Sequence, residues 1–116
     1  MKKKQLNELE DKIIKLSFSR NDLDKFAIYI NGNIDLIYER IIEIISIGIK
    51  LKLESVDIFE FKRPKDILIF KRNEWMGFFE RALSFFLKKE NYLVCEKIKQ
   101  SLDLLQKQEN KKLQRK

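Results

Sequence analysis

The sequence lacks histidine, and it has only one cysteine, one proline and three glycines among 116 residues. Without histidine, the commonest general base and the commonest nitrogen ligand of transition metals are both missing, which argues against zinc sites and His-activated nucleophiles. Cys95 has no second cysteine with which to form an intramolecular disulfide. The isolated glycines form no phosphate-binding loop. We therefore predict a protein that is not an enzyme, takes no small-molecule substrate and holds no cofactor or metal.

Long apolar runs are also absent. The most apolar stretch, IIEIISIGIKLKL at residues 41–53, contains Glu43 and two lysines, and it is shorter than the roughly 20 residues that a membrane-spanning helix needs. The basic start, MKKKQLNELEDK, is not followed by the apolar segment of a secretion signal. We expect an intracellular, cytoplasmic protein, or a component of a virus or mobile element, with no membrane partner.

The net charge of +7 lies at the two ends of the chain. Residues 2–4 are three lysines, and residues 107–116 carry five basic groups and one acidic group, whereas residues 5–106 have 17 of each sign. The C-terminal segment has one apolar residue in QKQENKKLQRK, a composition typical of disorder. We predict a basic tail at 1–4, a single helical domain at 5–106 and a disordered basic tail at 107–116.

Scarce glycine and proline, together with 44% hydrophobic residues, favour helices over a loop-rich β protein. Apolar residues recur at helical spacing in five segments, at residues 5–18, 23–30, 34 to about 50, 74 to about 88, and 92–106. The sequence predicts a mainly α domain of about five helices. Whether residues 49–53 continue the third helix or begin a strand stays open, because IKLKL alternates.

A short β-hairpin is predicted near residues 56–71. VDIFEF and DILIF are rich in β-branched and aromatic residues, and between them Pro64 disfavours helical geometry at Arg63. The apolar residues of the second strand are expected to feed the core, with charges protecting an exposed sheet edge; these apolar residues are Ile67, Leu68, Ile69 and Phe70.

The same hairpin is the candidate nucleic-acid site. Residues 61–72 carry five cations, which are Lys62, Arg63, Lys65, Lys71 and Arg72. Phe61, Phe70 and Trp75 lie among or beside them. In this hypothesis the five cations contact phosphates, and base stacking requires an exposed Phe61 or Phe70. A solvated hairpin is the alternative that we favour.

Acidic residues recur on the third helix at Asp35, Glu39 and Glu43, a spacing that places them on one face. Such a row can bind a divalent cation in principle, but with Arg40 beside it we interpret it as a solvated face.

The last predicted helix has an apolar seam at steps of three and four residues, and we predict it as a partner-binding seam. Its residues are Tyr92, Cys95, Ile98, Leu102 and Leu105.

Residues 81–105, RALSFFLKKENYLVCEKIKQSLDLL, resemble the UVR motif, a helical hairpin of excision-repair proteins and some bacterial chaperone-protease regulators. Ala82 matches the first Ala, Glu90-Asn91-Tyr92 the turn, Cys95 a small position and Lys99 the basic one, and Leu102 and Leu105 match the aliphatic positions. The usual Arg-Asp pair is Lys99-Gln100 here. The resemblance implies docking onto another protein through paired hairpins, with no catalysis in the motif.

These features give two hypotheses of different classes. The first is a small non-enzymatic interaction or assembly module, an adaptor or structural subunit, whose partner is another protein or a second copy. The alternative is a nucleic-acid-binding accessory protein that uses the basic hairpin at 61–72 and the basic tails.

Overall fold

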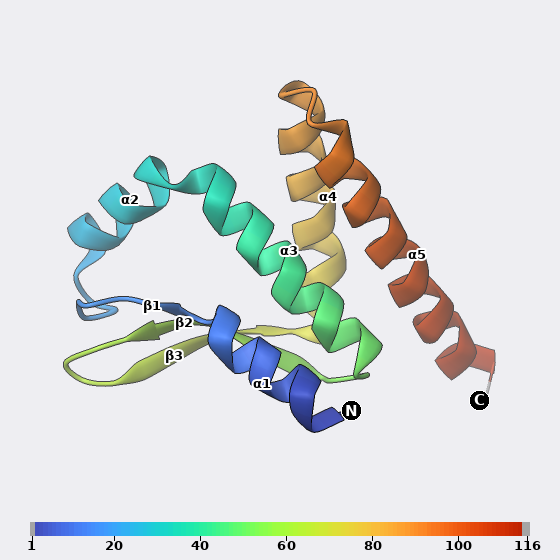
Figure 1. Ribbon diagram of the computed structural model, residues 1–116, viewed down its shortest axis with the longest axis horizontal. Helices are drawn as coiled ribbons and strands as arrows, with labels where there is room; N and C mark the ends of the chain where they lie inside the picture. The colour runs from blue at the N-terminus through green and yellow to red at the C-terminus, as the bar shows by residue number, and fades with distance from the viewer. Residues whose placement is uncertain (1, 115–116) are drawn as a thin grey trace. The chain divides into compact units, whose positions relative to one another are not determined.

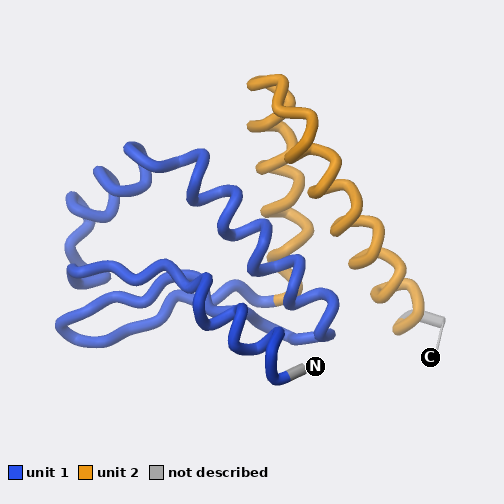
Figure 2. The backbone as a smooth tube through the Cα atoms, in the orientation of Figure 1, with its two compact units in different colours: residues 1–71 blue, residues 72–116 orange. Residues whose placement is uncertain are grey.

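A computed structural model describes residues 2–114 of the chain. In this range it has five helices and a three-stranded sheet, with 68% of the chain helical, so the predicted mainly α fold with a short β element is confirmed (Figure 1). The sequence predicts one domain over residues 5–106, and the structure divides the chain into two compact units, residues 1–71 and 72–116 (Figure 2). The boundary falls where a strand passes directly into a helix.

The first unit combines three helices with the sheet. The helices are α1 (Lys2–Lys12), α2 (Leu23–Gly32) and α3 (Ile34–Lys50), and the strands are β1 (Ile14–Lys15), β2 (Ser55–Phe61) and β3 (Asp66–Lys71). In the sheet, β2 lies between the other two strands, parallel to β1 and antiparallel to β3. The predicted hairpin is therefore confirmed, and β1 is an addition that the sequence did not predict.

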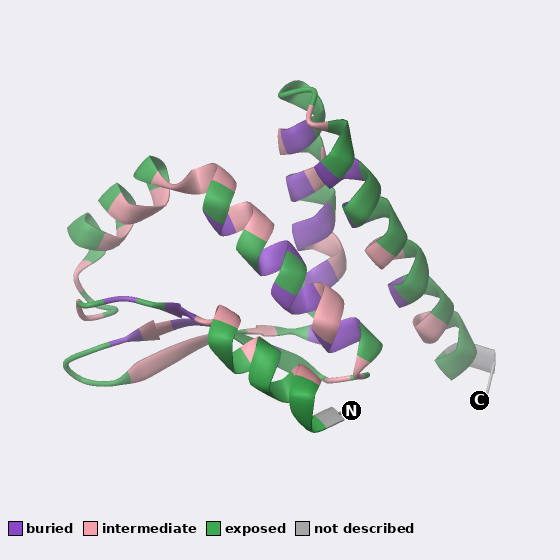
Figure 3. Cartoon of the chain, in the orientation of Figure 1, coloured by how far each residue is buried: buried purple, intermediate pink, exposed green. Residues whose placement is uncertain are grey.

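The core of this unit lies between α3 and β2. Ile44, Ile45 and Ile49 of α3 are fully buried, as are Ile58 and Phe61 of β2 (Figure 3). Isoleucine repeats at helical spacing along α3, so the helix has a buried apolar face that packs on β2.

The third helix ends within the segment 49–53 that the sequence left open. α3 stops at Lys50, and Lys52 takes a left-handed φ of 58°. The Leu53 N–H then donates to the Gly48 carbonyl at 2.9 Å, and the Lys52 N–H donates to that of Ile49 at 3.0 Å. This pair of bonds is a Schellman motif, so residues 51–53 are a helix-terminating turn and the strand begins at Ser55.

The helix predicted over residues 5–18 is wrong beyond Lys12, where α1 ends. Ile14 and Leu16 alternate with Lys15 and are both buried, because the chain runs beside β2 there. The Leu16 N–H donates to the carbonyl of Glu60 at 2.8 Å. This pairing partner is distant in the sequence, so the local helical spacing gave no sign of it.

The second unit is a helical hairpin of α4 (Arg72–Lys88) and α5 (Tyr92–Gln114), which pack along one another (Figure 1). α4 ends in a second Schellman motif, with Glu90 at φ 58° and the Asn91 N–H bonded to the Phe86 carbonyl at 2.9 Å. The Asn91 side chain then accepts a hydrogen bond from the Val94 N–H at 3.3 Å and so caps α5. Backbone groups at the end of α4 and at the start of α5 thus have hydrogen-bond partners within one tight turn.

Both predicted tails are helical where the structure describes them. Residues 2–4 belong to α1, and residues 107–114 continue α5, which was predicted to end at Gln106. The disordered-tail prediction missed the contacts that Gln108 and Glu109 make with Arg72, the first residue of α4. Residue 1 and residues 115–116 of the predicted tails lie outside the described residues.

Candidate functional site

The basic residues of the hairpin do not gather at one place. Lys62, Arg63 and Lys65 are exposed in the turn that joins β2 to β3, whereas Lys71 lies at the other end of β3, paired with Ser55. A strand rises about 3.3 Å per residue, so Lys65 and Lys71 lie roughly 20 Å apart. The five cations predicted as one site therefore include at least two separate positions.

Arg72 is buried, in contrast to the other four cations, with 8% of its surface exposed. Its Nε donates to Oε1 of Glu109 at 2.8 Å, a terminal nitrogen donates to Oε1 of Gln108, and its guanidinium lies 5.2 Å from the Trp75 ring centre. Because the Arg72 side chain is buried and makes these contacts, it does not lie where a phosphate would reach it. The two partners on α5 are 36 and 37 residues away, a separation that sequence pattern does not reveal.

Two of the three aromatic rings noted beside the basic residues are fully buried. Phe61 has no exposed surface and meets the edges of Phe18 and Phe26 at centroid distances of 6.3 and 5.4 Å. Trp75 is equally buried, and Phe70 is half-buried. Phe61 and Trp75 therefore serve the interior and offer no platform for base stacking.

The predicted partner-binding seam on α5 is largely internal. Cys95, Ile98 and Leu105 are buried, and Leu102 is half-buried, on a helix that packs along α4. Only Tyr92, at the start of α5, is well exposed, with 64% of its surface accessible. The spacing thus marked the packed side of the helix, which is what amphipathic spacing indicates in most globular domains.

The second strand of the hairpin is only partly covered, contrary to the prediction that its apolar residues feed the core. None of the residues of β3 is buried, although four consecutive ones are apolar, and Ile69 exposes 42% of its surface. In β2, by comparison, Val56, Ile58, Phe59 and Phe61 are all buried. The reason is position: β3 ends the sheet, and among the described residues its outer edge has no strand beside it.

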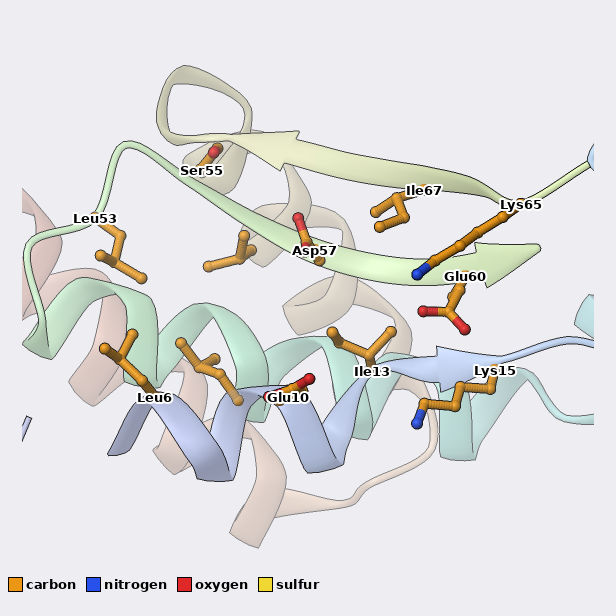
Figure 4. A pocket seen from close by; sticks show the side chains of 12 residues that line it. Leu6, Glu10, Ile13, Lys15, Leu53, Ser55, Asp57, Glu60, Lys65 and Ile67 are labelled. Atoms are coloured by element: carbon orange, nitrogen blue, oxygen red, sulfur yellow. The ribbon is translucent and has the colours of Figure 1, made fainter. Parts of the chain in front are cut away.

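A groove of about 400 Å³ lies between α1 and the hairpin within the first unit. Figure 4 shows Leu6 and Leu53 at one end and Lys15, Glu60 and Lys65 at the other. Glu10 and Asp57 also line it, so cations and carboxylates are mixed around the opening. The mixture gives no consistent charge with which to select a small ionic ligand.

The carboxylates of α3 border a second hollow, of about 440 Å³, which Glu39 and Glu43 line together with Arg40. Lys12 Nζ lies 2.6 Å from Glu43 Oε2, and Arg40 donates to the Lys12 carbonyl at 3.1 Å. Within residues 2–114, no group of three or more His, Cys, Asp or Glu side chains is arranged to hold a metal ion. These contacts tie the end of α1 to α3.

Comparison with known proteins gives no relative for this chain. No family model matches it, no curated protein is similar to it, and no solved structure resembles it. The residues of the UVR resemblance lie on a helical hairpin, α4 and α5, and no family model supports that resemblance. No helix in the described range is long and apolar enough to cross a membrane.

Proposed function

We propose that this chain is a small protein–protein interaction module without catalytic activity, and that the outer edge of β3 is its docking surface. One observation carries the proposal: β3 has four consecutive apolar residues, none of which is buried. An edge strand of this kind is a liability unless something covers it, because its apolar side chains and its edge N–H and C=O groups invite strand pairing. A partner chain that adds a strand covers the apolar side chains and pairs with the edge N–H and C=O groups at once.

The surroundings of β3 support this assignment. Its inner edge is fixed by β2 in a register that runs from Ser55 opposite Lys71 to Phe61 opposite Asp66. Because β2 in turn packs on α3, the core of the first unit holds β3 in place as a template for a partner strand. Such a rigid edge loses little conformational entropy when a partner binds, which favours affinity.

Peptide display tests the proposal and needs no identified partner. A library of linear peptides is selected against the wild-type chain and against a variant carrying Ile67→Gln and Ile69→Gln. We expect peptides enriched by the wild type to lose binding to this variant. The matched control carries Ile28→Gln and Leu36→Gln, two aliphatic residues that are 73% and 68% exposed on α2 and α3.

Circular dichroism of each variant shows whether it is folded. Peptides that bind wild type and control but not the β3 variant support the proposal. Peptides that bind all three proteins equally would overturn it, as would a complete failure to enrich any peptide. Oligonucleotide binding that disappears with Lys62→Gln and Arg63→Gln but survives the β3 changes would favour the nucleic-acid alternative instead.

A further inference from the structure

We infer that the strand accepted by β3 is an extended peptide with an apolar centre and with acidic residues at the end that meets the turn between β2 and β3. This inference rests on the proposed docking function of β3 and specifies the chemistry of its partner. The charge of the turn beside the strand carries it. The turn preceding β3 exposes Lys62 and Arg63.

Nearby carboxylates do not cancel this arrangement at the turn. Asp66, the first residue of β3, has its Oδ2 3.2 Å from Arg20, and its Oδ1 accepts a hydrogen bond from the Ile67 N–H at 2.9 Å. Glu60 belongs to β2 and faces the groove with Lys65 beside it, as Figure 4 shows. Lys62 and Arg63 thus remain as cations at the end of an apolar edge.

A peptide paired with this edge would span β3 and reach past both of its ends. Its central residues would meet the run from Ile67 to Phe70, and its two ends would lie near the turn and near Lys71. Opposite charges across neighbouring strands stabilise pairing, and like charges oppose it. Acidic residues at the end of the peptide that lies near the turn therefore match Lys62 and Arg63.

The same charges disfavour pairing of β3 with a second copy of itself. Two-fold antiparallel pairing centred on Leu68 places Lys65 of each copy opposite Lys71 of the other. Centring on Ile69 instead places Lys71 opposite Ile67 of the other copy, which sets a charge against an apolar residue. Neither register is self-complementary in charge, whereas a foreign strand with acidic residues near the turn is complementary to Lys62 and Arg63.

The test uses synthetic peptides and the full chain. The probe has the sequence Glu-Glu-Val-Thr-Val-Thr-Val-Glu-Glu with a fluorescent label, and its binding is followed by anisotropy at low salt. One control peptide has Lys in place of every Glu, and a second has Pro at the central Val, which removes a backbone donor. We expect the acidic peptide to bind at least about tenfold more tightly than either control, an advantage over the Lys peptide that weakens with salt.

Variants of the chain separate the charge from the strand. Lys62→Glu combined with Arg63→Glu keeps β3 intact, and we expect it to lose the preference for the acidic peptide or to reverse it. Ile69→Gln reduces apolar contact, and we expect it to weaken acidic-peptide binding about fivefold, whereas Ile28→Gln leaves binding unchanged. Light scattering on the unliganded chain should give a monomer.

Each outcome has a distinct meaning. Equal binding of acidic and basic peptides, or an acidic preference that survives the Glu substitutions, would overturn the inference. If display yields β3-dependent peptides without acidic flanks, the inference fails while the docking function stands. If no peptide depends on Ile69 in either experiment, both fail together. A dimer that is broken by Ile69→Gln would assign the edge to a second copy.

Discussion

The Nε atom of Arg72 lies 2.8 Å from Oε1 of Glu109, which joins the first residue of α4 to a residue near the end of α5. Arg72 is buried, whereas the Glu109 side chain is 41% exposed. The pair therefore combines a desolvated cation with a partly solvated acid, and it fastens the C-terminal turns of α5 to the base of the helical hairpin. A buried guanidinium depends on such partners because leaving it unpaired is costly.

Glu109→Ala should lower the free energy of unfolding by about 1–2 kcal/mol, because Arg72 loses a charged partner but retains Gln108 and Trp75. Because Glu109 is partly exposed, we expect this loss of stability to be small for an ion pair with a buried member. Urea unfolding measures the change, with the exposed Glu96→Ala on the same helix as control. Equal stability of the two variants would show that the Arg72–Glu109 contact contributes nothing.

Glu90→Gly should stabilise the chain by about 0.5–1 kcal/mol. Glu90 has a φ of 58°, a left-handed conformation that glycine adopts at little cost at the end of a helix. Lys88→Gly, within the last turn of α4, should instead destabilise it by a similar amount. Thermal melting of the two variants side by side checks the signs, and stabilisation by neither or by both would contradict the helix end described for α4.

Phe61→Ala should cost about 3–5 kcal/mol of stability, because the ring is fully buried among other aromatic residues. Phe18→Ala, which removes a half-buried ring from the edge of the same cluster, should cost less. Denaturant titration gives both values. A near-neutral Phe61→Ala would place the ring at the surface and would restore the stacking role that the sequence suggested.

Cys95 should react slowly with a thiol reagent in the native protein, because it is 3% exposed. We expect its rate to rise at least about tenfold on unfolding, since a buried thiol is protected from the reagent. A variant with Cys95→Ser and Ser84→Cys carries its thiol at an exposed position of α4 and should react rapidly when folded. Fast reaction of native Cys95 would mean that the apolar seam of α5 faces solvent after all.

The sequence was sufficient wherever local pattern decided the structure. The isoleucine repeat marked α3 from Ile34 to Lys50, and Pro64 between two β-rich segments marked the hairpin. It failed where a distant partner decided. β1 exists because Ile14 pairs with Phe59, and the last turns of α5 carry the partners of Arg72.

The candidate sites show the same division. Composition identified the cations of the hairpin, but only the structure shows that Lys71 lies away from the turn and that Arg72 is buried. Periodicity identified the seam of α5, but it could not distinguish a packed face from a docking face. The apolar residues of β3 were predicted to feed the core, and they are only half-buried or exposed, because apolar composition alone does not indicate how far a strand at a sheet edge is covered.

The measurement that tests the central claim most directly is an NMR titration of the labelled chain with the acid-flanked peptide. We expect the largest amide shift changes at residues 66–71, with smaller ones in the turn at 62–65, and slower hydrogen exchange along β3 as its outer edge becomes paired. Shift changes confined to α4 and α5, or none at saturating peptide, would contradict the assignment of β3 as the docking edge.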